Sequence, residues 1–171
     1  MESKTAKDHY LVGRDYFNKK EFDKALEAFT KAVESDPGFG PAFTELGITA
    51  DLKGDREKAV YYFKKAVELK PSVLNYTNLC IAVRKKEGPK AAAEIIEKAY
   101  QDLTQKEEVF KVSDEYALMK NMLCRCGRQY TSEDLSKQML KKIGDKEYDI
   151  LAIKCPKCQT ERELKFRVKV H

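Results

Sequence analysis

The chain has 171 residues, of which 36% are charged, and its mean hydropathy is −0.62. These values indicate one or two globular domains with a sizeable core. No apolar run approaches the roughly 20 residues that a transmembrane helix requires. The chain starts with polar residues and shows no apolar signal segment, so we expect a cytoplasmic protein. The net charge is +5, and all of this excess lies in residues 124–171, which hold 12 Lys and Arg against 7 Asp and Glu.

A set of small and aromatic residues recurs at a spacing of 34 residues. The set is Gly13, Ala25, Phe29, Ala32 and Pro37, and it returns as Gly47, Ala59, Phe63, Ala66 and Pro71. A fixed period of this length is typical of helical repeats. Each unit predicts two antiparallel helices, because Gly and Ala let the helices approach, Phe fills the space between them, and Pro ends the second helix.

These residues closely resemble the tetratricopeptide (TPR) repeat. The positions of the TPR pattern fall on His9, Val12, Gly13, Tyr16, Ala25, Phe29, Ala32 and Pro37, and then on Phe43, Leu46, Gly47, Ala50, Ala59, Phe63, Ala66 and Pro71. A weaker third unit matches at Leu79, Cys80, Val83, Ala92, Ile96 and Ala99, but it has Thr104 in place of the last proline. The resemblance covers roughly residues 5–104 and implies a mainly α fold, a solenoid of about three helical hairpins.

The missing third proline suggests that the chain continues as a helix beyond Thr104. Val109, Val112, Tyr116, Met119 and Leu123 follow at helical spacings, so residues 105–123 are predicted to form a helix that caps the repeats. The predicted domains are therefore a TPR domain with its capping helix, residues 1–123, and a second module, residues 124–171.

The TPR resemblance implies a concave groove that is lined by the first helix of each repeat and holds a protein or peptide. The candidate contact residues are Lys7, Tyr10, Arg14, Phe17, Glu45, Ile48, Asn78, Ile81, Arg84 and Lys85. One TPR subclass binds the C-terminal carboxylate of chaperones, but its positions carry Tyr10, Arg14, Glu45, Leu74 and Asn78 here, and Glu45 would repel an anion. The alternative is that Arg14, Arg84 and Lys85 belong to a solvated helix face.

Two close cysteine pairs lie in the second module. Cys124 and Cys126 are separated from Cys155 and Cys158 by a spacing that is typical of a four-thiolate zinc site. Disulfides are the alternative, but they are rare in a reducing compartment. A closed shell of four thiolates predicts a structural Zn²⁺ and not a catalytic one. Cys80 stands apart at a packing position and is expected to be buried.

The module is predicted to be a small α+β fold around this metal. Thr131 to Asp134 matches a capping box that opens a helix, which would bury Leu135, Met139 and either Leu140 or Ile143 and end at Gly144. Residues 148–154 and 163–170 read as a strand pair with Cys155 and Cys158 in or near its turn. The unit resembles a zinc ribbon, except that one residue and not two separates the first cysteine pair.

Two functions follow, in different classes. The first is a protein–protein interaction scaffold, with a TPR groove joined to a structural zinc module. The second is nucleic-acid binding by the basic module, in which Lys165, Arg167 and Lys169 alternate along one strand. Catalysis is disfavoured, because the chain has only two histidines, His9 and His171, and no catalytic motif. We expect no membrane partner, and a homodimer stays open.

Overall fold

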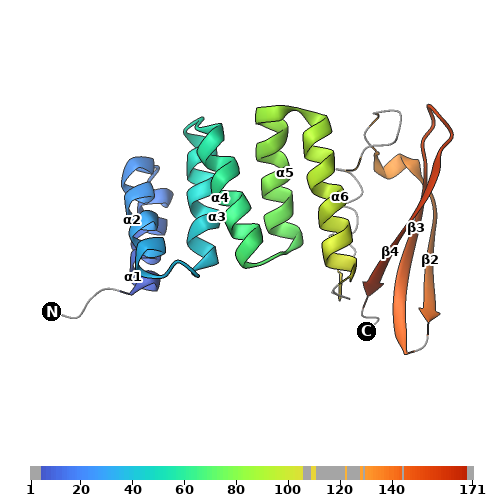
Figure 1. The fold of residues 1–171 in the computed structure, drawn as a ribbon, viewed down its shortest axis with the longest axis horizontal. Helices are drawn as coiled ribbons and strands as arrows, with labels where there is room; N and C mark the ends of the chain where they lie inside the picture. Colours follow the sequence, from blue (N-terminus) through green and yellow to red (C-terminus); the bar gives the residue numbers. More distant parts are fainter. Residues whose placement is uncertain are drawn as a thin grey trace. The chain divides into compact units, whose positions relative to one another are not determined.

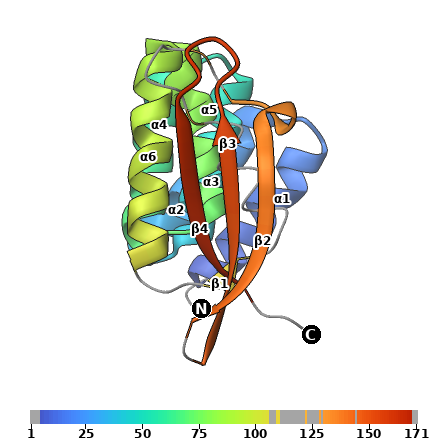
Figure 2. The same ribbon diagram turned by 90° about the vertical axis from the view of Figure 1, so that its right-hand side faces the viewer.

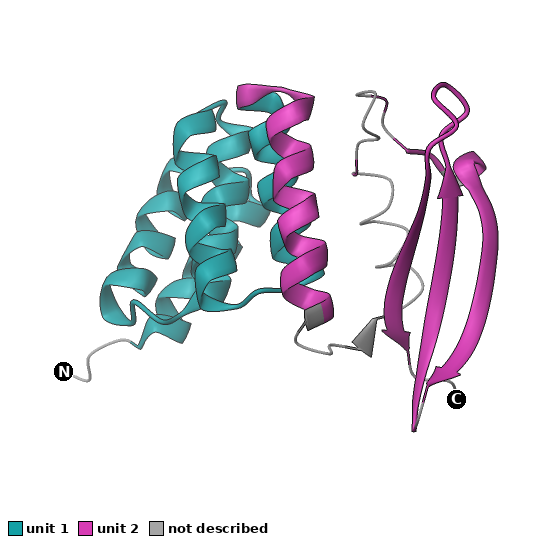
Figure 3. Ribbon diagram, turned by 45° about the vertical axis from the view of Figure 1, so that its right-hand side comes forward, with its two compact units in different colours: residues 1–86 teal, residues 87–171 magenta. Residues whose placement is uncertain are grey.

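The structure is a computed structural model that describes residues 5–105, 109–110, 122, 128, 130–143 and 145–168. Its secondary structure runs from helices to strands along the chain (Figure 1). The chain divides into two compact units, unit 1 (Met1–Lys86) and unit 2 (Glu87–His171) (Figure 3). The predicted domain boundary between residues 123 and 124 falls outside the described residues and stays a prediction.

Unit 1 is built from helical hairpins, as the repeat predicts. Its helices are α1 (Ala6–Asn18), α2 (Phe22–Ser35), α3 (Gly40–Leu52), α4 (Arg56–Leu69) and α5 (Val73–Glu87), the last of which ends at the unit boundary. Helix α1 packs against α2, α3 packs against α4, and α2 joins the two hairpins by packing against α3. The first helices of the three repeats are therefore α1, α3 and α5.

Small residues hold each hairpin together at close range. A Cβ placed on Gly13 would lie 2.5 Å from two ring carbons of Phe29, and one on Gly47 would lie 2.6 Å from the ring of Phe63. Ala25 and Ala59 are completely buried. The pattern residues are thus the ones that the packing requires, since a larger side chain at any of them would push the helices apart.

The turns within the hairpins keep the same period as the side chains. Lys20 has φ 61°, Gly54 has φ 81° and Gly88 has φ 96°, and these residues follow one another at 34-residue intervals. Each lies in the short connection after the first helix of a repeat, where the left-handed backbone reverses the chain. The third member shows that the repeat period extends to the connection between α5 and α6 (Pro89–Gln105).

Unit 2 combines helix α6 with a four-stranded sheet. The other elements are β1 (Val109–Phe110), the 3₁₀ helix η1 (Ser132–Asp134), β2 (Leu135–Ile143), β3 (Lys146–Lys154) and β4 (Glu161–Val168). The strand order is β1-β4-β3-β2, in which β2, β3 and β4 are antiparallel neighbours and β1 runs parallel to β4. Figure 2 looks onto the three long strands.

The predicted strand pair is present. Strands β3 and β4 pair from Lys154 with Glu161 to Glu147 with Val168, and the segment with Cys155 and Cys158 is the turn between them. Leu164 and Phe166 on β4 are fully buried, as their alternation with polar residues predicts. This part of the second module therefore follows from the sequence pattern.

The predicted helix after Asp134 is wrong. The capping-box residues form only the short η1, and Leu135–Ile143 is strand β2, in which Leu140 is 67% exposed and Ile143 is 42% exposed. The apolar residues fit a helical spacing, but β3 needs a partner for its second edge, and a two-residue connection brings residues 135–143 there. Its three lysines suit an exposed edge strand.

The predicted capping helix is also contradicted where the structure describes it. Val109 and Phe110 form β1 beside Arg167 and Val168 of β4, so they are extended and not helical. A β-branched and an aromatic residue favour this conformation. Val112, Tyr116, Met119 and Leu123 lie outside the described residues. Within the described ranges, no helix is long and apolar enough to cross a membrane.

Candidate functional site

The predicted groove residues lie on the first helices of the repeats. Helix α1 carries Lys7, Tyr10, Arg14 and Phe17, α3 carries Glu45 and Ile48, and α5 carries Asn78, Ile81, Arg84 and Lys85. Lys7, Arg14, Ile81 and Lys85 are exposed and the other six are half-buried. We call this set the A-helix face. Its role in binding stays a prediction, whereas its placement on α1, α3 and α5 is an observation.

Three of these residues meet between α1 and α3. The Arg14 guanidinium lies 6.0 Å from the centroid of the Tyr10 ring. Partial burial raises the pKa of the Glu45 carboxyl group, while the Arg14 charge and the Tyr10 hydroxyl both act to lower that pKa. The cluster places a half-buried carboxylate near Arg14 on the A-helix face.

The basic end of the A-helix face is paired internally. Lys85 on α5 forms an ion pair with Asp51 on α3, and its carbonyl accepts a hydrogen bond from Arg56 at 3.1 Å. Lys85 is therefore committed to joining α3 and α5, which weakens its candidacy as a ligand contact.

Two aromatic residues of the face also support the core. Tyr10 and Phe17 pack against the buried cluster of Ala25, Phe29 and Leu46. The Phe17 ring also meets the Phe22 ring edge to face, with centroids 5.7 Å apart. Each of these two side chains is partly buried in the core and partly exposed, so only the exposed part is available to a partner.

Exposed apolar side chains gather on the first helices. Leu11 is 52% exposed, Leu52 is 57% exposed, Leu74 is 65% exposed and Ile81 is 43% exposed. All four lie on α1, α3 or α5, the helices that also carry the half-buried Ile48. Single exposed apolar residues are ordinary, but several on one set of helices mark an interaction surface.

A buried asparagine that the sequence analysis missed fastens α5 within unit 1. The Asn75 amide donates to the carbonyl oxygens of Ala66 at 3.2 Å and Lys70 at 2.8 Å, and its oxygen lies 3.3 Å from the Thr44 hydroxyl. Asn75 follows the second repeat's proline, Pro71, by four residues, and that position is the signal that could have identified it.

The second cysteine pair lies on one tight turn. The Cys155 amide donates to the Thr160 carbonyl at 3.0 Å, and the Gln159 amide donates to the Cys155 carbonyl at 2.8 Å. Gln159 has φ 59°, which turns the chain sharply after Cys158. Cys155 is buried and Cys158 is exposed, with its sulfur 3.1 Å from the Thr160 hydroxyl. Such a turn can present two thiolates to one metal ion.

Cys124 and Cys126 lie outside the described residues. The residues that flank them are described at Met122 and Tyr130, both buried, and the Tyr130 amide donates to the Met122 carbonyl at 3.2 Å. This bond joins two residues that lie on either side of the first cysteine pair in the sequence. In the described part of the chain, no group of three or more His, Cys, Asp or Glu side chains is placed to hold a metal ion.

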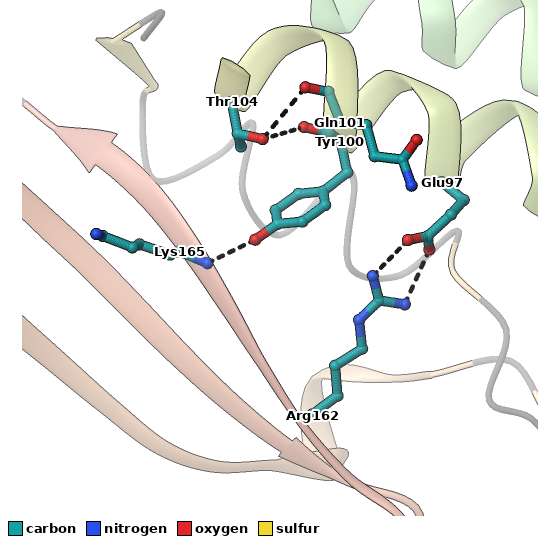
Figure 4. A network of polar contacts seen from close by, with 6 residues as sticks. All are labelled: Glu97, Tyr100, Gln101, Thr104, Arg162 and Lys165. Carbon is teal, nitrogen blue, oxygen red and sulfur yellow. Dashed lines mark hydrogen bonds and ion pairs between the residues drawn. The ribbon is translucent and has the colours of Figure 1, made fainter.

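Helix α6 is attached to β4 by a polar network that the sequence did not reveal (Figure 4). Arg162 makes two hydrogen bonds to the Glu97 carboxylate, at 2.8 and 2.6 Å, and the Lys165 amide donates to the Tyr100 hydroxyl at 2.9 Å. The Tyr100 ring meets the Phe166 ring edge to face at 5.5 Å. One helix of the third repeat is thus part of the same compact unit as the sheet.

Comparison with known proteins supports the repeat. Sequence profiles described as tetratricopeptide repeat match residues 6–39 and 41–73. No curated protein sequence matches the chain. Among solved structures, a crystal structure of MamA has a TM-score of 0.55 at 23% identity, over 60% of each chain.

Two structures of yeast Sti1 are also similar. The complex of its TPR2B domain with pHsp70 has a TM-score of 0.53 at 20% identity and covers 58% of this chain and 81% of that chain. The complex of its TPR2AB domains with pHSP90 has a TM-score of 0.54 at 20% identity, over 58% of this chain and 39% of that chain. Identities this low show the fold alone. Residues 6–39 and 41–73 are TPR repeats, a fold that serves as a protein-interaction scaffold.

Proposed function

We propose that the chain is a protein–protein interaction scaffold whose A-helix face binds an amphipathic segment of a partner. The observation that carries this proposal is the exposure of Leu11, Leu52, Leu74 and Ile81 on α1, α3 and α5, the first helices of the repeats. A partner helix or extended segment with apolar side chains on one face would remove these residues from water. MamA and Sti1 are similar to this chain in fold.

The charges of the face argue for apolar anchors and against a C-terminal carboxylate. Glu45 occupies the middle of the face and would repel a carboxylate placed near Arg14. Lys85 is already paired with Asp51. The carboxylate-binding subclass has a polar residue at the position of Leu74. The Leu74 side chain has no hydrogen-bond donor, and it is the most exposed of Leu11, Leu52, Leu74 and Ile81.

Peptide display against the full chain tests this function. We expect enrichment of Leu, Ile or Phe at helical spacings, with no requirement for a free C-terminus. Ile81→Glu should weaken selected peptides by more than about tenfold, because a buried apolar contact at an interface is replaced by a charge. Leu69→Glu is the matched control, since Leu69 on α4 is equally exposed, at 43%. Peptides that need a C-terminal carboxylate, or that bind Ile81→Glu normally, would contradict the proposal.

We also propose that unit 2 holds one structural Zn²⁺ through Cys124, Cys126, Cys155 and Cys158. The proposal is supported by the turn that carries Cys155 and Cys158 and by the hydrogen bond between Met122 and Tyr130, which lie on either side of the first pair in the sequence. When bound, the ion would cross-link two loops that are distant in sequence and so stabilise a small module.

Metal analysis after reducing, chelator-free purification should find about one equivalent of zinc. Cys158→Ser should lower the bound zinc and the thermal stability of the chain, while Cys80→Ser, outside the site, should leave the zinc content unchanged. A wild-type protein without zinc, or zinc content that is the same in Cys158→Ser, would rule out this ligand set.

Nucleic-acid binding is the second candidate function. It is favoured by the concentration of the whole net charge in residues 124–171. Four thiolates with Zn²⁺ would carry a net charge of about −2 and would offset part of this excess. Salt-dependent binding to mixed oligonucleotides supports this candidate, and absence of binding at low salt excludes it. Cytoplasmic location and homodimer formation stay predictions, the latter checked by light scattering.

A further inference from the structure

The register of β2, β3 and β4 assigns their paired residues to one of two faces of the sheet. Residues directly opposite each other on neighbouring antiparallel strands point to the same side. Leu151, Leu164 and Phe166 define the core face, on which Tyr100 of α6 packs. The other side is here called the open sheet face. It contains Lys137, Met139, Lys141 and Ile143 of β2, Lys146, Tyr148, Ile150, Ala152 and Lys154 of β3, and Glu161, Glu163, Lys165 and Arg167 of β4.

The open sheet face is strongly basic. It carries six Lys and Arg side chains and two acidic ones, and one of the acids, Glu161, is paired with Lys154 at 3.1 Å. Lys137, Lys141 and Lys165 are exposed, and within the described ranges none of the three forms an ion pair. The excess positive charge of the second module therefore lies mainly on one side of the sheet. Binding of a polyanion requires basic side chains that are clustered on one face in this way.

An aromatic ring lies in the middle of these charges. Tyr148 stands between Lys141 on β2 and Arg167 on β4, so all three side chains start within about 10 Å of one another. The Lys165 ammonium lies 4.1 Å from the centroid of the Tyr148 ring. Met139 and Ile150 form the next row of the same face, in which Met139 is half-buried and Ile150 is buried.

We propose that the open sheet face binds single-stranded nucleic acid, with the bases stacked on Tyr148 and the phosphates held by Lys141, Lys165 and Arg167. An anionic strand with planar apolar bases complements both properties of the face, its charge and its central ring. A duplex hides its base faces and could use only the charge. This proposal rests on the second candidate function and locates it, independently of the A-helix face.

The contact between Lys165 and Tyr148 does not oppose stacking. Tyr148 is half-buried. A cation over a ring that water still reaches is a weak interaction, and base stacking on an aromatic side chain is comparable or stronger. The Lys165 side chain is exposed and long, whereas its backbone amide is held by Tyr100. The ammonium can therefore move from the ring to a phosphate while β4 stays in place.

Fluorescence anisotropy with a labelled oligouridine of about 12 nucleotides tests the proposal on the full chain. Lys141→Glu/Lys165→Glu should abolish binding at low salt. The neutral version, Lys141→Gln/Lys165→Gln, should lower the log–log salt slope by about 1.4, because each phosphate that a lysine neutralises on a single strand accounts for about 0.7. Tyr148→Leu should weaken binding by about 5- to 150-fold with an unchanged salt slope, because it removes stacking and no charge. Thermal unfolding of each variant establishes that it is folded.

The matched control is Lys90→Glu/Lys98→Glu, which makes the same charge change at two exposed lysines of α6 in the same unit. It should bind nearly as well as wild type. If the control and the sheet variant weaken binding equally, net charge explains binding and the open sheet face is not the site. If Tyr148→Leu has no effect, or if polyglutamate competes as well as unlabelled RNA, a nucleic-acid site is refuted. If the wild type does not bind at all, the second candidate function itself fails.

Discussion

The packing of each hairpin on a glycine makes Gly13→Ala a sharp test of the repeat structure. The added methyl group would lie 2.5 Å from two carbons of the Phe29 ring, far inside an ordinary contact. The Phe29 side chain is fully buried and its ring contacts Tyr10, with centroids 5.9 Å apart. The ring has no solvent into which it can move, so α1 and α2 must separate to accept the methyl group.

Two effects of opposite sign set the magnitude. Replacing a glycine inside a helix by alanine stabilises it by about 0.8–1 kcal/mol. Overpacking a core costs about 1–3 kcal/mol, and a fully buried ring that must shift by about 1 Å belongs at the upper end of that range. We therefore expect a net loss of about 1–2 kcal/mol in the free energy of unfolding. A surface helix position would show the reverse sign.

Urea denaturation of the full chain, followed by far-ultraviolet circular dichroism, measures this change. Gly40→Ala is the control, because a Cβ there would lie 3.8 Å from Leu69, an ordinary contact, and we expect little or no loss. In a Phe29→Leu background the methyl group gains space, so Gly13→Ala should become neutral or stabilising. Gly13→Ala that is as stable as wild type, or equally damaging in both backgrounds, would refute the proposed packing.

Three further predictions concern stability. Ala25→Leu should cost about 1–3 kcal/mol or more by overpacking α2, and a thermal unfolding midpoint equal to that of wild type would contradict this. Hydrogen bonds from Arg128 and from the Thr131 amide and hydroxyl hold the pKa of Asp134 below its usual value, so Asp134→Asn should cost about 1.5–3 kcal/mol at neutral pH. A lowered pKa of Asp134 stabilises the folded state above the unfolded-state pKa of about 3.9, and this stabilisation is lost as the pH falls through the folded-state pKa. A stability difference between wild type and Asp134→Asn that is the same at pH 7 and pH 3 would exclude this mechanism. Arg162→Met should cost only about 1 kcal/mol, because its pair with Glu97 is partly exposed, and a double-mutant cycle with Glu97→Gln measures the coupling.

The sequence predicted local features well where a residue type is compatible with only one local structure. Gly13 and Gly47 predicted a close approach of two helices, and each does lie against a phenylalanine ring of the second helix. Pro37 and Pro71 predicted helix ends, and each follows the last residue of a second helix by two positions. The same reasoning failed for residues 135–143, because their apolar residues fit both a helix and a strand. For that segment the choice depends on whether a partner strand is available, which the local pattern does not state.

The candidate groove shows the same division. The TPR pattern assigned the right helices to Tyr10, Glu45 and Ile81, since helical periodicity is a local property. It did not show that Lys85 is paired with Asp51. Side-chain pairs between different helices depend on the distances that packing sets, and residues 34 apart in sequence carry no local signal of such a pair.

The sequence by itself determined the hairpins of unit 1, because the 34-residue spacing of small, aromatic and helix-ending residues restricts each helix pair to close antiparallel packing. It also determined the strand pair around Cys155 and Cys158, since alternation and a tight turn are local. Only the tertiary structure decided that β2 completes the sheet, that α6 packs on β4, and that Lys141, Tyr148 and Lys165 share one face. These outcomes depend on strand register and on contacts between distant segments, where backbone hydrogen bonds and buried apolar area outweigh local preference.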